Sequence, residues 1–233
     1  MIQIGGLQKL TLIDFPGRLA ATVFLTGCNF RCPFCYSSEL VLPEKIKNQP
    51  KISEKDLFKF LKERKSLLEG VVLCGGEPTI YQDLAKFCQK IKKLGYLVKL
   101  DTNGSNPKIL KKLIVENLLD YVAMDVKLPK ERYQEVIFAE GIKIKDIEES
   151  IKILKEGKID YEFRTTVVPT IHQKEDILKI VQWIKPAQKY FLQNFRPEKT
   201  IDPKFEKIKP YPQEYLLEIQ KAISPFFEVC QIR

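Results

Sequence analysis

The sequence predicts an α/β protein: a partial (β/α)6 barrel of parallel strands with helices on the outside. Six short apolar or β-branched segments alternate with segments of helical periodicity along nearly the whole chain. Strands joined by crossover helices pair in parallel, because a tight turn cannot reach a parallel neighbour. With 233 residues and 44% apolar side chains, the chain has the size of one α/β barrel domain, so we expect a single domain over residues 1–233.

The predicted strands are separated by the helical segments. They are the segments 20–26, 71–74, 97–101, 121–125, 161–168 and 190–195. The tail, 212–233, adds a helix and a short strand at 227–232. Ligands in such folds collect at the carboxyl ends of the strands, so we expect the chemistry in the residues directly after each strand.

The helices between the strands show one apolar stripe and clear end signals. The segment 82–94 repeats apolar residues at helical spacing, and Gly95 follows it to take the left-handed conformation. Ser53 begins a capping box that opens a predicted helix over 54–69, which Gly70 closes. These local signals agree with the periodicity.

The charge balance is basic, and it limits the classes of partner. Lys and Arg number 39 against 30 Asp and Glu, which gives a formal charge of +9. The lysines are spread beside glutamates without an aromatic-interleaved basic block, so we expect a solvated surface and no nucleic-acid partner. The longest uncharged stretch, 19–30, is about half of the roughly 20 residues that a spanning helix needs. Since no secretory signal opens the chain, we expect no membrane partner and a cytoplasmic location.

Three of the six cysteines, Cys28, Cys32 and Cys35, lie within eight residues after the first predicted strand. A CxxxCxxC loop lets three thiolates converge on one metal centre, and soft thiolates select zinc or iron–sulfur clusters. A structural zinc site needs a regularly spaced fourth ligand, but the next cysteines are Cys74 and Cys88, the latter in an apolar helical stripe. The loop therefore favours an iron–sulfur cluster with one open iron. A non-catalytic zinc or electron-transfer module is the alternative from a different class.

A CxxxCxxC loop with an aromatic residue before its last cysteine resembles the signature of the radical S-adenosylmethionine (SAM) enzymes, and the likeness covers nearly the whole chain. The resemblance implies a [4Fe–4S] cluster held by the three cysteines and reductive cleavage of SAM to a 5′-deoxyadenosyl radical. It places Phe34 and Tyr36 beside the cofactor, although many relatives have histidine where this chain has Tyr36. Gly75, Gly76 and Glu77 resemble the GGE motif that receives the methionyl amino group of SAM. Paired glycines allow close backbone approach, and a carboxylate can accept from an ammonium.

Two further strand ends resemble segments of the glycyl-radical-enzyme activases, a subgroup of that family. Asp101 and Thr102 end the third predicted strand, and Asp125 and Lys127 stand at the end of the fourth. The resemblance implies that these four residues help to bind SAM, with Lys127 near its carboxylate. It also implies a monovalent cation between the two aspartates. The structural alternative is that aspartates at strand ends only cap the next helix.

Within this subgroup, the segments 6–17 and 161–169 most closely resemble the activase of anaerobic ribonucleoside-triphosphate reductase. In such activases an aspartate beside a Pro-Gly turn and an arginine on the fifth strand hold the glycine loop of the partner. Asp14 and Arg164 match those positions. The resemblance therefore implies that a glycyl radical is generated on a partner, the anaerobic ribonucleotide reductase. An ion pair between Asp14 and Arg164 is the structural alternative.

The remaining expectations concern the electron donor, two neighbouring functions and two single residues. A flavodoxin or ferredoxin would supply the electron, and a basic surface suits an acidic donor. A pyruvate formate-lyase-type activase shares all of these motifs. A small-molecule enzyme such as a 7-carboxy-7-deazaguanine synthase shares the cluster and the GGE segment. His172, the only histidine, is expected to be a local cap or a surface residue, and Trp183 to pack.

Overall fold

The computed structural model describes residues 2–137 and 141–233, whose strands form one eight-stranded sheet in chain order. All neighbouring pairs from β2 to β8 are parallel, whereas β1 pairs antiparallel with β2. Among the described strands β1 and β8 do not pair, so the barrel is open, which confirms the predicted fold class. The strands are β1 (Ile4–Thr11), β2 (Ala20–Leu25), β3 (Gly70–Gly75), β4 (Leu97–Thr102), β5 (Tyr121–Asp125), β6 (Asp160–Val167), β7 (Lys189–Asn194) and β8 (Val229–Ile232).

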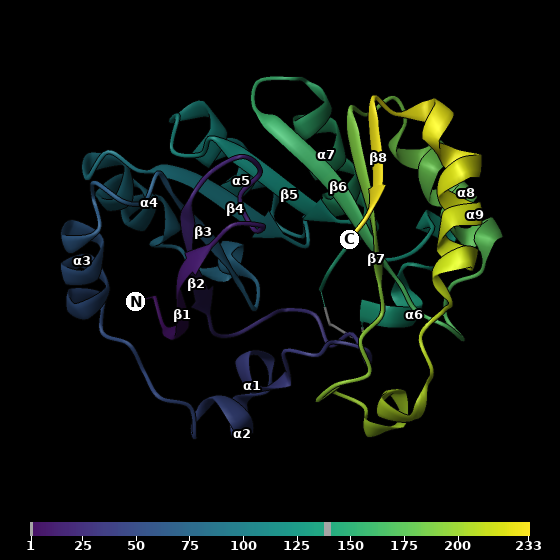
Figure 1. Ribbon diagram of the computed structural model, residues 1–233, viewed down its shortest axis with the longest axis horizontal. Helices are drawn as coiled ribbons and strands as arrows, with labels where there is room; N and C mark the ends of the chain where they lie inside the picture. The colour runs from purple at the N-terminus through teal and green to yellow at the C-terminus, as the bar shows by residue number, and fades with distance from the viewer. Residues whose placement is uncertain (1, 138–140) are drawn as a thin grey trace.

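The sheet bends into an arch, with helices along its convex side and two short helices on its open side (Figure 1). Helices α3, α4, α5, α7, α8 and α9 follow the outside of the arch, while α1 and α2 lie across the opening. The bounds are α1 (Ser38–Val41), α2 (Pro43–Ile46), α3 (Glu54–Glu63), α4 (Leu84–Lys93), α5 (Pro107–Val115), α6 (Gln134–Ile137), α7 (Ile144–Lys155), α8 (Lys174–Ile184) and α9 (Gln213–Ile223).

Among the described strands, β1 is the one that the hydrophobic pattern did not predict. Its sequence contains Gly5, Gly6 and Lys9, and only Ile4 and Thr11 are buried, so no clean alternation of apolar and polar residues marks it. Its register with β2 also shifts at two places, as in bulged edge strands. The strand forms because its backbone finds a partner in β2, a tertiary contact that local propensity does not reveal.

Several helix ends follow the predicted signals, and one does not. The Ser53 hydroxyl accepts from the backbone N–H of Asp56 at 3.0 Å, and Gly95 has a φ of +90°. Helix α3, however, ends at Glu63, six residues before the predicted end. Gly70 begins β3 instead of closing the helix, and a Cβ there would lie 2.8 Å from the ring of Phe15. The glycine is needed for this packing, which the sequence does not show.

Two apolar clusters leave a polar space on the concave side of the sheet. The large cluster joins the helices to the convex face of the sheet through residues such as Leu73, Leu100 and Ile180. The small cluster of Phe15, Ala20, Val72 and Tyr121 involves the amino ends of β2 and β5. Above it, at the carboxyl ends, the strands present charged side chains. Among the described residues, no helix combines the length and apolar character needed to cross a membrane.

Candidate active site

A cavity of about 480 Å³ opens on the concave side at the carboxyl ends of the strands. Residues of β2 to β7, or of the loops that follow these strands, contribute to its wall. All of the predicted site residues line it: Asp14, Cys28, Cys32, Phe34, Cys35, Tyr36, Gly75, Gly76, Glu77, Asp101, Thr102, Asp125, Lys127 and Arg164. The structure therefore brings the predicted site residues together in one cavity, and their chemical roles stay predictions.

The cysteine loop runs from the end of β2 to α1 and is held by its own backbone. The N–H of Cys35 donates to the carbonyl of Cys32 at 3.0 Å, and the N–H of Phe30 donates to Cys28 Sγ at 3.3 Å. Arg31 Nη1 donates to the carbonyl oxygens of Cys28 and Phe30 at 2.6 and 2.8 Å. These bonds hold the loop so that all three sulfurs face one cavity.

The three thiols share a buried environment that suits a positively charged metal centre. Burial raises the pKa of Cys28 and of Cys32 to about 12, and it raises the pKa of Cys35 as well. Thiolates, the form that binds metal, therefore need a compensating positive charge. Lys127 supplies part of it, because its charge lowers the pKa of Cys32 and Cys35. In the described part of the chain, no group of three His, Cys, Asp or Glu side chains has the spacing of a single-ion site.

The glycine pair lets the end of β3 lie directly against the cysteine loop. A Cβ on Gly76 would come within 1.8 Å of the carbonyl oxygen of Gly27, and one on Gly75 within 2.5 Å of that of Leu25. The N–H of Glu77 then donates to the Gly27 carbonyl at 2.8 Å. The sequence predicted that the glycine pair lets the backbone approach a ligand closely. In this structure the backbone that the pair approaches is that of β2 and of the loop after it.

Glu77 is almost fully buried and joins the loop after β3 to the end of β4. Its Oε1 accepts from the Thr79 N–H at 3.0 Å, the Thr79 hydroxyl at 2.6 Å and the Thr102 hydroxyl at 2.7 Å. Its Oε2 accepts from the Asn103 N–H at 2.6 Å. Burial raises the pKa of Glu77, although these donors lower it. The carboxylate thus has four protein donors, and its predicted contact with an amino group stays a prediction.

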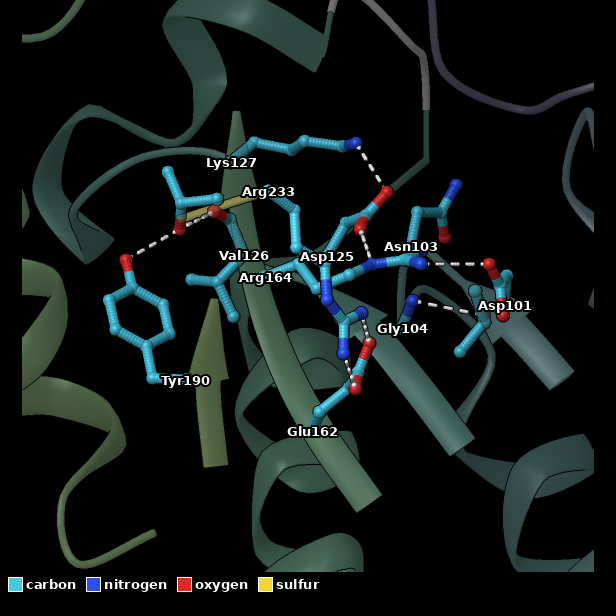
Figure 2. A network of polar contacts seen from close by, with 12 residues as sticks. Asp101, Asn103, Gly104, Asp125, Val126, Lys127, Glu162, Arg164, Tyr190 and Arg233 are labelled. Carbon is cyan, nitrogen blue, oxygen red and sulfur yellow. Dashed lines mark hydrogen bonds and ion pairs between the residues drawn. The ribbon is translucent and has the colours of Figure 1, made fainter. Parts of the chain in front are cut away.

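Arg164 of β6 lies between the carboxylates of Asp101 and Asp125 (Figure 2). Its Nη1 donates to Asp101 Oδ2 at 2.8 Å and its Nε to Asp125 Oδ1 at 2.9 Å. Lys127 Nζ donates to Asp125 Oδ2 at 2.8 Å, and the buried Lys99 forms an ion pair with Asp101. Burial opposes the charge on both carboxylates, but these cations hold the pKa of Asp101 and of Asp125 below the ordinary value.

This arrangement corrects two of the structural alternatives. The described contacts of Asp101 and Asp125 are with cations, and neither carboxylate caps a helix. No ion pair joins Asp14 and Arg164 within the described residues, because Asp14 Oδ2 accepts from the Thr22 hydroxyl at 2.6 Å and Arg164 is held elsewhere. Asp14 lines the cavity from the loop between β1 and β2.

The aromatic side chains around the cavity differ in position. Phe34 is buried, and its ring centroid lies 6.5 Å from that of Phe205. Tyr36 lies at the rim and is 53% exposed. Trp183 packs edge-on against Tyr133, with 5.8 Å between centroids, as its apolar surroundings predicted.

His172 is fully buried, so its expected surface position is wrong, and the residue that caps the following helix α8 is Gln173. Its Nδ1 accepts from the Val168 N–H at 3.1 Å, and its Nε2 lies 2.6 Å from the carbonyl oxygen of Lys127. Since Nδ1 is an acceptor, Nε2 carries the proton and donates to that carbonyl. The imidazole therefore fixes the backbone of Lys127 from behind the site.

Sequence reasoning missed four residues that complete the polar interior. Lys99 pairs with Asp101, and Asn103 Nδ2 donates to Asn29 Oδ1 at 3.0 Å, close to Cys28. Arg233 donates to both carboxylate oxygens of the buried Glu162, at 2.7 and 3.1 Å. For Lys99 and Glu162 the available signal was a charged residue two positions before another charge on the same strand, in Lys99-x-Asp101 and Glu162-x-Arg164. Residues two apart share one face of a strand.

A comparison with known families decides the wider assignment. The model of the Radical SAM superfamily matches residues 22–184, which include the three cysteines, the glycine pair and the aspartate–arginine network. The chain belongs to the radical SAM superfamily. As a radical SAM enzyme, it is expected to use a [4Fe–4S] cluster and SAM, and the three cysteines that line one cavity are the residues that would hold the cluster. The non-catalytic zinc or electron-transfer module is set aside by this membership.

Relatives of this radical SAM enzyme include proteins with different names. A Methanocaldococcus jannaschii protein named "Putative glycyl-radical enzyme activating enzyme" is 33% identical over 238 residues, which cover 99% of this chain and 95% of the relative. A 7-carboxy-7-deazaguanine synthase of Methanopyrus kandleri is 29% identical over 132 residues, 49% of this chain and 52% of the relative. The crystal structure of Streptococcus suis SuiB matches 88% of this chain with a TM-score of 0.64 and 17% identity. The radical SAM chain spans about half of SuiB, 47%, so this likeness shows the fold alone.

Proposed function

We propose that this radical SAM enzyme generates a glycyl radical on a partner enzyme, the anaerobic ribonucleoside-triphosphate reductase. The observation that carries the proposal is that Asp14, in the loop between β1 and β2, and Arg164, on β6, line the same cavity as the three cysteines. The relative that covers 99% of the chain has a name of this class and supports the same activity.

One group of residues would hold the cofactors, and another would contact the partner. Cys28, Cys32 and Cys35 would hold the cluster, and Lys127 would face the carboxylate of SAM. When bound, the cluster and SAM would supply a 5′-deoxyadenosyl radical and methionine, once a flavodoxin or ferredoxin has donated one electron to the cluster. A glycine Cα of the partner would lose a hydrogen atom to this radical, which would leave 5′-deoxyadenosine and a glycyl radical. The protein contributes position and exclusion of water.

Glycine is the residue that the cavity suits as a target. It has no side chain to block the approach of its Cα, and its radical is delocalised over the neighbouring peptides. The free carboxylate oxygen of Asp14 can accept from a backbone N–H of the entering loop, since its other oxygen is held by Thr22. Because β1 and β8 do not pair among the described strands, the barrel is open, as entry of a loop from another protein requires.

Two neighbouring functions remain for the same chemistry. A pyruvate formate-lyase-type activase differs only in the partner. A 7-carboxy-7-deazaguanine synthase would take a small molecule, and the relative with that name matches 49% of this chain. The monovalent cation that the resemblance implies competes with Arg164 for the two aspartates, and it is treated in the next subsection.

The first experiment tests SAM cleavage. The protein is reconstituted anaerobically with iron and sulfide, reduced, and supplied with SAM, and 5′-deoxyadenosine is measured by chromatography. The wild type is expected to form it, and the matched Cys32→Ala variant is expected not to. Equal formation by both proteins would contradict the assignment of the cluster ligands.

The second experiment tests the partner. Anaerobic ribonucleoside-triphosphate reductase is added, and a glycyl doublet is sought by electron paramagnetic resonance. The Asp14→Asn variant is expected to keep slow, uncoupled SAM cleavage while the doublet falls. A doublet only with pyruvate formate-lyase would replace the proposed partner, and none with either would leave the small-molecule function.

A further inference from the structure

The carboxylates of Asp101 and Asp125 already have more positive charge around them than they carry. Two negative groups contact three cationic side chains: Lys99 and Arg164 contact Asp101, and Arg164 and Lys127 contact Asp125. All five side chains are largely buried; the Lys99 side chain is only 1% exposed and the Arg164 side chain 12%. The group therefore has a surplus of one positive charge inside the barrel.

We propose that Arg164 takes the place of the monovalent cation that the likeness to activases implies, so that SAM binding needs neither K⁺ nor Na⁺. The inference rests on the proposed role of Asp101 and Asp125 in SAM binding. It makes Arg164 a built-in counter-ion between the two aspartates, as well as a residue that faces the partner.

The charge balance argues against an added ion at this position. A cation between the two aspartates would lie beside Arg164, Lys99 and Lys127, whose side chains are largely buried, and like charges repel more strongly there than in water. It would also have to displace the Arg164 guanidinium, whose Nε and Nη1 each donate to a different carboxylate within 2.9 Å. A guanidinium stays charged at every relevant pH, so its charge does not depend on the buffer.

The backbone also holds Arg164 in this position. Residues Asp125 and Arg164 are register partners on the adjacent strands β5 and β6, and the N–H of Val126 donates to the Arg164 carbonyl at 2.8 Å. Glu162, the nearest acid on the same strand, is neutralised by Arg233 and does not draw Arg164 away. Among the described residues Nη2 of Arg164 makes no hydrogen bond, which leaves one donor edge for a carbonyl of the partner loop.

The test measures SAM binding instead of turnover. Equilibrium dialysis with the oxidised, cluster-loaded protein is run at constant ionic strength in potassium, sodium or tetramethylammonium chloride. The wild-type Kd is expected to agree within about twofold among the three salts. The Arg164→Met variant is expected to bind at least about tenfold more weakly in tetramethylammonium chloride, and K⁺ or Na⁺ should recover most of that loss. Arg164→Lys, which keeps the charge, should stay insensitive to the cation.

Controls keep the outcomes distinct. Arg18→Met removes an arginine from an exposed ion pair with Glu69 and should bind SAM like the wild type in all three salts. Circular dichroism shows whether the Arg164 variants fold, and the lysine variant decides the question if the methionine variant does not. A wild-type affinity that rises more than about tenfold with K⁺ overturns the inference alone. Absence of SAM binding in every salt overturns the proposed function instead.

Discussion

At the scale of single residues, Glu77 shows how a motif residue can act through the protein as well as through a ligand. The four donors around its carboxylate come from the loop after β3 and from the end of β4. A buried carboxylate with this many donors holds both segments in place. The GGE motif predicted that Glu77 contacts a ligand. The structure shows in addition that Glu77 joins two segments of the protein, which motif spacing does not reveal.

We expect Glu77→Gln to destabilise the apo protein by about 1–3 kcal/mol, because an amide NH₂ would face donors that now meet a carboxylate oxygen. Urea unfolding followed by circular dichroism measures the change. The matched control is Glu54→Gln, which alters an exposed pair with Lys90 and should change the free energy of unfolding by less than about 0.5 kcal/mol. Equal changes in the free energy of unfolding for the two substitutions would show that the Glu77 hydrogen bonds stabilise the protein no more than an exposed ion pair does.

At the scale of elements, the loop between β6 and α8 carries a pH-dependent contact. Burial lowers the pKa of His172 below its ordinary value of 6.5. The unfolded chain therefore takes up a proton at a higher pH than the folded chain. The contribution of this residue to stability is complete above the unfolded pKa and is lost as the pH falls toward the folded one.

The free energy of unfolding is therefore expected to fall as the pH is lowered from about 7 to about 5, where the ordinary pKa of histidine lies. His172 is the only histidine in the chain, so no other imidazole contributes in this window. Urea titrations at several pH values provide the measurement. The His172→Gln variant should show a flatter profile, and an unchanged slope in the variant would assign the dependence to other groups.

The last strand, β8, is joined to the barrel interior through the side chain that follows it. Arg233 pairs with Glu162, which is fully buried and also accepts from the Tyr121 hydroxyl at 2.9 Å. We expect Arg233→Ala to cost about 2–4 kcal/mol, because it leaves a buried charge without its cation. Urea unfolding again provides the measurement.

A second substitution separates the charge from the packing of Arg233. Adding Glu162→Gln to Arg233→Ala should recover part of the lost stability, since the buried group is then neutral. Arg18→Ala serves as the surface comparison and should cost less than about 1 kcal/mol. If the double variant is no more stable than Arg233→Ala, the stacking of Arg233 on Phe191, 3.5 Å from its ring centroid, is the main contribution.

At the scale of the whole molecule, the formal charge of +9 bears on how an electron donor finds the enzyme. An acidic flavodoxin should reduce the cluster at a rate that falls about tenfold as ionic strength rises from about 50 to 300 mM, because salt screens long-range attraction. Stopped-flow spectroscopy measures the rate. Reduction by the methyl viologen radical, itself a cation, should not slow, and a salt-independent flavodoxin rate would count against electrostatic docking.

The single domain over 1–233 and the cytoplasmic location remain predictions, whereas the arrangement of the barrel is largely settled. Its strand order follows the chain, as short crossover connections require. Six predicted strands and the short tail strand correspond to β2 to β8 within two residues at either end. The antiparallel β1 could not be predicted because its pairing is a property of β2 as much as of its own residues.

The sequence by itself determined the strand–helix alternation, the cysteine loop and the strand-end residues that line the cavity, because periodicity and motif spacing are local properties. Only the tertiary structure decided how the buried charges pair. Arg164 meets carboxylates that are 39 and 63 residues away in the chain, and Glu162 meets Arg233 71 residues away. Such partners depend on the register of neighbouring strands and on the closeness of strand ends, so the sequence named the charged residues while the folded barrel paired them.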